Sequence, residues 1–223
     1  MSDAIRDAAT VLVLRRDAAG PSVLMGMRGA SAAFMPSKYV FPGGAVDAAD
    51  ADVALARPLA SRCHDRLMDE GGPTPDTIAA AALRELAEET GLLIGRPGGP
   101  PCPWPGHAAA GLTPDAAPLV HLFQAITPPG RPRRFDAHFF VADAASIAGD
   151  PDDFSAACDE LSHLHWVPLA QARALDLPFI TEVVLAELSD LVRDLPPDQP
   201  LPTPATVPFF DNRGPAPVFR QIA

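Results

Sequence analysis

The segment from Thr74 to Gly91 constrains the fold most, because it carries the local marks of an amphipathic α-helix at both ends and along its length. Thr74 can cap the first turn, Pro75 suits the first helical position, and Asp76 lies where the helix dipole favours an anion. Gly91 can end the helix as its C-terminal cap. Apolar residues recur between them with a period of about 3.6 residues, at Ile78, Ala79, Ala82, Leu83 and Leu86. The segment therefore predicts a helix from Thr74 to Thr90 with one buried face.

Three glutamates stand close together near the end of this helix, within the run RELAEETGLL from Arg84 to Leu93. Glu85, Glu88 and Glu89 are spaced so that all three carboxylates share one helical face. Like charges at this spacing destabilise a helix by roughly a few tenths of a kcal/mol per pair. The residues alone leave two interpretations: a solvated acidic face, or a site for a hard cation such as Mg²⁺ or Mn²⁺, which prefers oxygen ligands.

The rest of the chain predicts an α/β fold. A β-hairpin is expected from the apolar runs 10–14 and 22–27, which flank a polar stretch ending in Gly20-Pro21. A short strand, 39–41, is stopped by Pro42-Gly43-Gly44, where unusual backbone angles become available. Segment 95–118 is rich in Pro and Gly and is expected to be a loop. Further strands are expected at 119–126, 137–142 and 163–167, and further helices at 169–175 and 181–192.

Composition excludes several classes of protein and favours others. The chain has 223 residues and a net charge of −11, which disfavours a nucleic-acid binder because such proteins need clustered basic charge. A small phosphorylated substrate is compatible with this charge. No apolar run reaches the length of a membrane span, and the first ten residues do not resemble a signal peptide. Three scattered thiols, Cys63, Cys102 and Cys158, favour a reducing, cytoplasmic setting over a disulfide framework.

At the glutamate run, the sequence resembles the Nudix hydrolases. Their motif is G-x5-E-x7-R-E-U-x-E-E-x-G-U, in which U is a bulky aliphatic residue. The run from Arg84 to Leu92 (RELAEETGL) matches the second half at every fixed position, and Phe41-Pro42-Gly43-Gly44 resembles the strand and turn that open the motif. The resemblance implies a Nudix α/β/α sandwich with a mixed β-sheet. It also implies structural roles for Arg84 and Gly91.

Two features depart from the Nudix motif. The family has a Glu eight residues before the Arg, where this chain has Asp76, and a shorter carboxylate could still form the structural ion pair with Arg84. Gly44 and Arg84 are 40 positions apart where the motif has 14, so 26 extra residues separate the turn from the helix. We therefore expect one Nudix domain over residues 1–223, with an insertion at about 48–73 and a Pro-rich C-terminal tail at about 195–223. The pair Phe209-Phe210 predicts that the tail packs onto the domain.

The resemblance implies a hydrolase that cleaves a diphosphate linkage with the help of Mg²⁺ or Mn²⁺. Glu85, Glu88 and Glu89 would hold the metal, and the carbonyl of Gly44 would add a ligand. A carboxylate then acts as general base; Glu85 is one candidate. The other is Glu160, because relatives often take the base from a later loop of this kind.

The interrupted motif and the segment RRFDAHFF, residues 133–140, resemble the coenzyme A and acyl-coenzyme A diphosphatase branch of the family. A coenzyme A signature of a neighbouring branch is matched in part: Arg28 and 41–44 are present, but Ala33 and Ser37 replace its second Arg and its Gly. Arg28, Arg133 and Arg134 are the candidate phosphate ligands, whereas His138 is interpreted as a core or rim residue.

Two other functions stay open at this stage. The first is a Nudix hydrolase of ADP-ribose, of dinucleotides or of another nucleoside diphosphate derivative. The second is a catalytically inactive Nudix module that senses a ligand, although it would be expected to have lost the metal carboxylates. The expected partner is a small nucleoside diphosphate compound, with no nucleic acid and no membrane, and a homodimer stays open.

Overall fold

The computed structural model describes residues 4–29, 35–68, 72–214 and 216–223. Its main feature is a nine-stranded sheet in the order β11-β10-β7-β8-β1-β2-β3, with β4 paired to β1 and β9 paired to β2. The strands of this sheet are β1 (Ile5–Asp17), β2 (Gly20–Arg28), β3 (Tyr39–Val40), β4 (Gly43–Ala45), β7 (Val120–Ile126), β8 (Arg134–Asp143), β9 (Leu161–Pro168), β10 (Val207–Asp211) and β11 (Val218–Ile222). The expected N-terminal hairpin is β1 and β2.

The sheet is mixed, as predicted. β1 runs parallel to β8, and β10 runs parallel to β7, whereas β1 is antiparallel to both β2 and β4. The long pairing of β1 with β8 extends from Ile5 opposite Arg134 to Leu14 opposite Asp143, so it forms the centre of the sheet.

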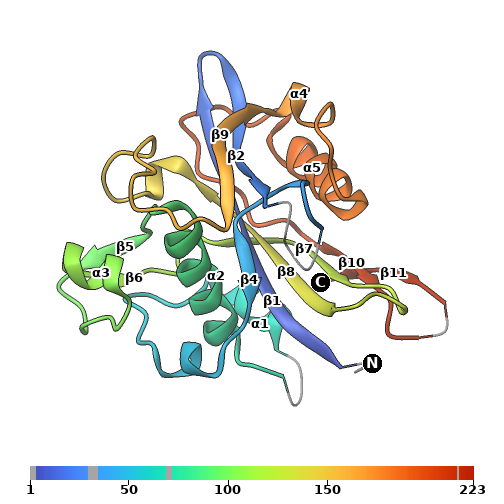
Figure 1. The fold of residues 1–223 in the computed structure, drawn as a ribbon, viewed down its shortest axis with the longest axis horizontal. Coiled ribbons are helices and arrows are strands. Elements are labelled where there is room, and N and C mark those ends of the chain that lie inside the picture. The colour runs from blue at the N-terminus through green and yellow to red at the C-terminus, as the bar shows by residue number, and fades with distance from the viewer. Residues whose placement is uncertain (1–3, 30–34, 69–71, 215) are drawn as a thin grey trace.

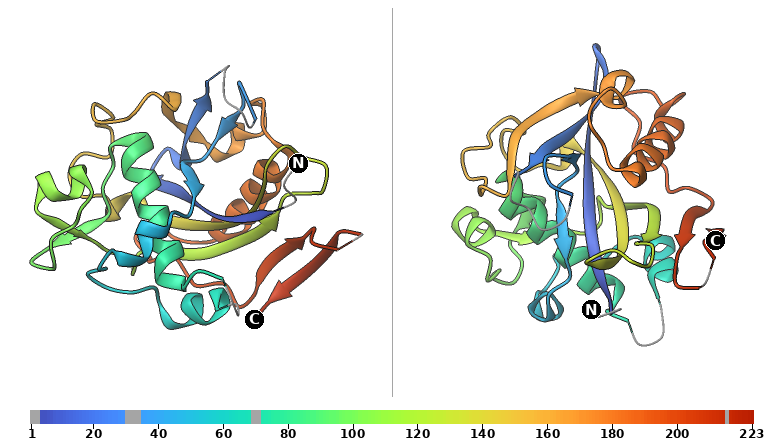
Figure 2. Two further views of the ribbon diagram at one scale, coloured as in Figure 1. Left: turned by 60° about the horizontal axis from the view of Figure 1, so that its bottom comes forward. Right: turned by 45° about the vertical axis from the view of Figure 1, so that its right-hand side comes forward.

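Helices cover both faces of the sheet, which confirms the α/β/α arrangement. They are α1 (Ser61–Leu67), α2 (Pro75–Thr90), α3 (Pro105–Ala110), α4 (Leu169–Ala172) and α5 (Phe179–Val192). Alternate residues of β1 divide between two cores: Val11 and Val13 pack with α1 and α2, whereas Leu12 and Leu14 pack with α5. Figures 1 and 2 show α2 and α5 on opposite sides of β1 and β8.

The helix predicted from Thr74 to Thr90 is present as α2, with the expected signals at both ends. The Thr74 side chain accepts a hydrogen bond from the backbone N–H of Thr77, and Pro75 occupies the first turn. Gly91 ends the helix in the left-handed conformation, with φ of 77°. Both caps are local in sequence, which explains why the sequence predicts this element well.

The segment expected to be a loop and the expected insertion both contain short elements. The region 95–118 holds β5 (Gly95–Pro97), α3 and β6 (Leu112–Pro114), with β5 and β6 forming a separate two-stranded sheet. The region 48–73 holds the 3₁₀ helix η1 (Ala48–Asp52) and α1; a second 3₁₀ helix, η2, covers Ala144–Ser146. Elements this short carry too few turns for a periodic signal. No helix in the described part of the chain is long and apolar enough to cross a membrane.

The C-terminal segment packs onto the domain, as the two phenylalanines predict. Its strands β10 and β11 form an antiparallel pair that extends the sheet beyond β7. Figure 2 shows this pair, in red, at the edge of the molecule. Phe209 is buried, and Phe210 packs against the core that contains α5.

Candidate active site

The strand β4 and the last two turns of α2 meet in one place. β4 pairs with β1 through Gly44 opposite Ala9, which holds the strand against the centre of the sheet. The backbone N–H of Gly43 donates a hydrogen bond of 2.7 Å to Oε2 of Glu89. A Cβ atom on Gly44 would lie 2.5 Å from the carboxylate of Glu85, so only glycine permits this close approach.

Arg84 ties this group of side chains to the segment between β4 and α1. Its guanidinium donates to both carboxylate oxygens of Asp50, at 2.8 and 3.0 Å, and to the carbonyl of Ala45 at 3.0 Å. It also donates to Glu85 at 2.8 Å and to Glu88 at 3.2 Å. Burial opposes the charge of Arg84, yet the hydrogen bonds that it donates to Asp50 and Glu85, with the negative charges of these carboxylates, hold its pKa above the usual value.

The expected ion pair between Asp76 and Arg84 is wrong. Asp50, which is 1% exposed, takes that role, while Oδ1 of Asp76 is buried without a hydrogen bond. The two ends of α2 are too far apart for a direct contact, since eight residues of helix span roughly 12 Å. Asp50 was missed because its only local signal is the capping box that it forms with Asp47 at the start of η1.

Burial and mutual repulsion raise the pKa of two of the glutamates. Burial raises the pKa of Glu89 to about 8, with the Gly43 N–H opposing and the charge of Glu85 adding to the shift. Burial likewise raises the pKa of Glu85, against the opposing charge of Arg84. Oε1 of Glu89 is buried without a hydrogen bond. Such a group of oxygens is stabilised by a cation.

Stability of the metal-free protein should therefore fall as the pH rises. The pKa of Glu89 is about 8 in the folded chain and 4.5 for an ordinary glutamate, so between these values the folded state binds more protons than the unfolded state. Linkage then requires the free energy of unfolding to decrease from about pH 5 to about pH 8, by an amount on the order of a few kcal/mol. Urea titrations in the presence of a chelator measure this, and Glu89→Gln should flatten the profile. A wild-type profile as flat as that of the variant would contradict the assignment.

Arg28 approaches the glutamates from the end of β2, and Glu160 approaches them from the turn that precedes β9. Arg28 is paired with Leu161 in the antiparallel register, so it lies beside the residue that follows Glu160. Its guanidinium is 3.9 Å from Oε1 of Glu89. Glu160 is exposed, and its charge adds to the effect of burial in raising the pKa of both Glu85 and Glu89.

Comparison with solved structures identifies the family. A NUDIX hydrolase from Alicyclobacillus acidocaldarius is 31% identical in sequence to this chain and superposes on it with a TM-score of 0.62. The match covers 83% of this chain and 91% of that protein. The chain belongs to the Nudix hydrolase family. No family model matched the chain in a separate comparison.

Two curated Nudix proteins are similar over shorter regions. The acyl-coenzyme A diphosphatase NUDT19 of Gallus gallus is 37% identical over a 97-residue alignment, and the match covers 33% of this chain and 25% of that protein. Putative nudix hydrolase 7 of Caenorhabditis elegans is 28% identical over a 165-residue alignment, and the match covers 65% of this chain and 46% of that protein. The chain thus spans less than half the length of either relative.

The backbone at Ser37 bears on one of the two departures from the coenzyme A signature. Ser37, which stands where that signature has Gly, adopts a φ of 58°, a left-handed conformation that favours glycine. The backbone thus keeps the shape that the glycine would allow, although the residue differs. Ala33, the other departure, lies outside the described residues.

The two arginines near the start of β8 lie apart from this group. Arg134 is 6% exposed and donates to the backbone carbonyls of Thr127 and Asn212, at 3.0 and 2.8 Å. The expectation that it binds a substrate phosphate is therefore wrong, because its guanidinium is part of the interior. Arg133 is exposed in the connection between β7 and β8, and its role in phosphate binding stays a prediction.

Proposed function

We propose that this Nudix hydrolase is a metal-dependent diphosphatase that acts on coenzyme A or acyl-coenzyme A. The convergence of Glu85, Glu88 and Glu89 with the Gly43-Gly44 segment of β4 supports the reaction. Similarity to an acyl-coenzyme A diphosphatase over a third of the chain supports the substrate class. Retention of all three glutamates argues against an inactive ligand-sensing module.

The donor set fits Mg²⁺ or Mn²⁺. Both ions prefer carboxylate, carbonyl and water oxygens, and the three glutamates with the Gly44 carbonyl supply only oxygens. Oε1 of Glu89, which accepts no hydrogen bond, is one such donor. When bound, such an ion neutralises charge on the diphosphate and lowers the pKa of a water molecule.

The residues of the chain itself would position the substrate and move a proton. Arg28, next to Glu89, would donate to the diphosphate oxygens. Glu160 is the better candidate for the general base, because Oε1 of Glu85 already accepts a hydrogen bond from Arg84 at 2.8 Å, whereas Glu160 is exposed. A water oxygen bonds to one phosphorus, its proton passes to Glu160, and the bridging oxygen leaves with the other phosphate. The products are adenosine 3′,5′-bisphosphate and a phosphopantetheine compound.

A substrate panel tests this proposal. Dephospho-coenzyme A lacks only the 3′-phosphate, and a charge-assisted contact to that phosphate contributes roughly 1.5–3 kcal/mol. Coenzyme A or an acyl-coenzyme A should therefore be hydrolysed with a kcat/KM about tenfold to a hundredfold higher than that of dephospho-coenzyme A or ADP-ribose. Product separation after reaction with Mg²⁺ or Mn²⁺ measures the rates and identifies the cleaved bond. A tenfold preference for ADP-ribose would overturn the coenzyme A proposal in favour of the alternative substrate class.

Two variants extend the panel. Arg28→Ala should lower kcat/KM for coenzyme A and dephospho-coenzyme A alike, because both carry the diphosphate. Arg133→Ala should abolish the preference for coenzyme A while leaving turnover of dephospho-coenzyme A nearly unchanged. If the Arg133 variant kept the substrate preference of the wild type, another part of the protein would bind the 3′-phosphate.

A further inference from the structure

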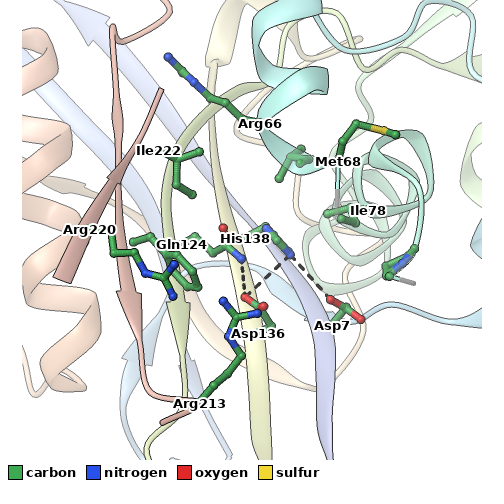
Figure 3. A pocket seen from close by; sticks show the side chains of 14 residues that line it. Asp7, Arg66, Met68, Ile78, Gln124, Asp136, His138, Arg213, Arg220 and Ile222 are labelled. Atoms are coloured by element: carbon green, nitrogen blue, oxygen red, sulfur yellow. Dashed lines mark hydrogen bonds and ion pairs between the residues drawn. The ribbon is translucent and has the colours of Figure 1, made fainter. Parts of the chain in front are cut away.

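A second group of ionisable side chains lies in a cavity at the other end of α2. The cavity has a volume of about 240 Å³ and lies between the strands β1, β7 and β8, the helices α1 and α2, and the C-terminal strands. Figure 3 shows Asp7, Asp136 and His138 at its centre, with Ile78 of α2 facing them. Ile78 belongs to the first turns of α2, whereas the candidate active-site glutamates belong to the last two turns. The two sites are therefore distinct.

The strand register brings two carboxylates side by side. Asp7 of β1 is the direct partner of Asp136 of β8 in the parallel pairing, and both belong to the face of the sheet that packs against α1 and α2. Like charges directly opposite each other in a sheet are destabilising. A cation between the two carboxylates would remove this repulsion.

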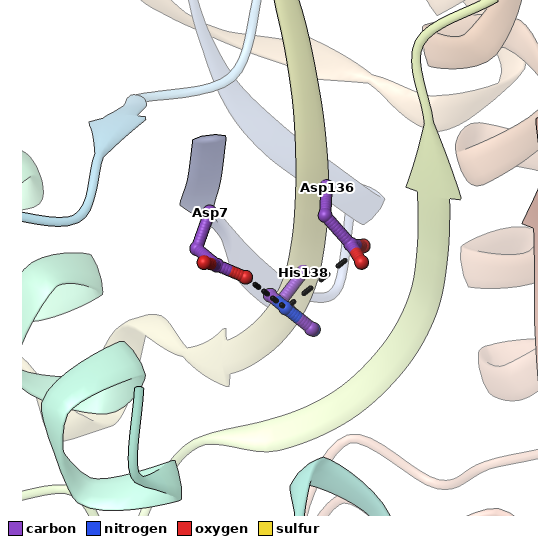
Figure 4. Close-up of side chains that lie close together, drawn as sticks. All are labelled: Asp7, Asp136 and His138. Atoms are coloured by element: carbon purple, nitrogen blue, oxygen red, sulfur yellow. Dashed lines mark ion pairs between the residues drawn. The ribbon is translucent and has the colours of Figure 1, made fainter. Parts of the chain in front are cut away.

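His138 points its ring between these carboxylates without forming a hydrogen bond to either. Its Nε2 is 3.9 Å from Oδ1 of Asp7 and 4.0 Å from Oδ1 of Asp136, both longer than a hydrogen bond. His138 is 5% exposed, and its buried Nδ1 has no hydrogen-bond partner. Figure 4 shows the ring held between the two carboxylates. A buried imidazole in this arrangement leaves room for an ion between three donor atoms.

We propose that Asp7, Asp136 and His138 form a binding site for Zn²⁺. Their ligand atoms all lie within 4.8 Å of one another. Zn²⁺ binds nitrogen and oxygen at about 2.0–2.2 Å in a tetrahedral arrangement, so two ligand atoms on one ion are about 3.4 Å apart. Movements of up to about 1.5 Å bring the ligand atoms to this separation, and Asp7, whose side chain is 36% exposed, has room to move. Imidazole favours Zn²⁺ over Mg²⁺, which sets this site apart from an all-oxygen site.

The surroundings support the carboxylates as ligands. Gln124 donates a hydrogen bond of 2.8 Å to Oδ1 of Asp136, as an outer partner that orients a metal ligand does. Three arginines also line the cavity, and each has a partner of its own. The guanidinium groups of Arg213 and Arg220 are both bound to Asp211. Arg66 donates to the backbone carbonyls of Pro204 and Ala205 at 2.7 Å. The two carboxylates and the divalent ion together carry no net charge.

Bound Zn²⁺ would also stabilise the strand that supports the candidate active site. The backbone carbonyl of Asp7 accepts a hydrogen bond of 2.9 Å from the N–H of Val46, the residue that follows β4. An ion on the Asp7 side chain would thus fix β1 where it holds the end of β4. We expect thermal stability to increase with Zn²⁺, by about 5–10 °C at a free concentration 100 times the dissociation constant.

The site is tested by equilibrium dialysis of the untagged chain against Zn²⁺ in the presence of excess Mg²⁺. Metal analysis of the dialysed protein then gives the equivalents of bound Zn²⁺. The variants Asp7→Asn and Asp136→Asn should each bind one equivalent of Zn²⁺ less than the wild type. Gln124→Ala should weaken its binding by about 10- to 100-fold, the range for loss of an outer partner. Asp65→Asn is the matched control, because it removes an exposed carboxylate 3.7 Å from the imidazole of His64. Glu88→Gln controls for Zn²⁺ held by the candidate active site.

The outcomes separate this site from the candidate active site. Loss of one equivalent in the Asp7 and Asp136 variants, with retention in the Asp65 and Glu88 variants, supports the proposal. Loss only in the Glu88 variant would assign the Zn²⁺ to the active site and overturn it. Absence of bound Zn²⁺ in the wild type, or full retention in the Asp7 and Asp136 variants, would overturn it as well. Asp7 is half-exposed, so its variant should fold even where a change at buried His138 would not.

Discussion

Glu88→Gln and Glu89→Gln are each expected to lower turnover of a coenzyme A substrate by about two orders of magnitude or more. The reaction builds negative charge on a diphosphate that is already anionic, and each variant removes one charge from the group proposed to hold the metal. Loss of one key charge-stabilising interaction costs roughly 2.7–4 kcal/mol of transition-state stabilisation. Steady-state kinetics with saturating Mg²⁺ measure the effect.

Both variants should retain the native fold, which separates a catalytic loss from unfolding. Glutamine at position 89 can still accept the hydrogen bond from Gly43, and it is neutral, the state that burial favours at this position. Glu88 is 55% exposed, so the loss of its contact with Arg84 has little effect on stability. Glu182→Gln, on the exposed side of α5, is a matched control that should leave turnover unchanged. Near-normal activity of either variant with full Mg²⁺ dependence would show that the metal assignment is wrong.

Features that depend on neighbours in sequence could be predicted from the sequence. Thr74, Pro75 and Gly91 mark the two ends of α2 in the sequence. Helical periodicity alone places the three glutamates on one face. The mixed sheet follows from apolar runs separated by turns, together with the resemblance to the Nudix family. The structure then adds that Gly43 binds Glu89 and that Gly44 touches Glu85.

Features that depend on contacts distant in sequence could not be predicted in this way. Arg84 and Asp50 are 34 residues apart, and Arg134 contacts a carbonyl 78 residues away. An arginine that binds backbone carbonyls looks in sequence like one that binds phosphate, since both need only its donors. The pairing of Asp7 with Asp136 likewise depends on the parallel register of β1 and β8, which no local pattern specifies.

Asp50→Asn is expected to destabilise the protein by about 3 kcal/mol, because it breaks the ion pair that fixes Arg84. Removing one partner of a buried ion pair costs roughly 3–5 kcal/mol. The low end applies here, since Glu85 and Glu88 still contact the guanidinium at 2.8 and 3.2 Å. For a chain of this size, the change corresponds to a fall in Tm of about 6–12 °C.

Asp76→Asn is the control that distinguishes the two candidate partners of Arg84. Asp76 contributes chiefly through the dipole of α2, a term of about 0.3–1 kcal/mol, so this variant should change Tm by only a few degrees. Thermal unfolding of both variants, followed by circular dichroism, compares them directly. If Asp76→Asn proved the more damaging of the two, Arg84 would be held from the start of its own helix. Because Asp50 instead lies between β4 and α1, we expect the segment 48–73 to take part in orienting the catalytic helix.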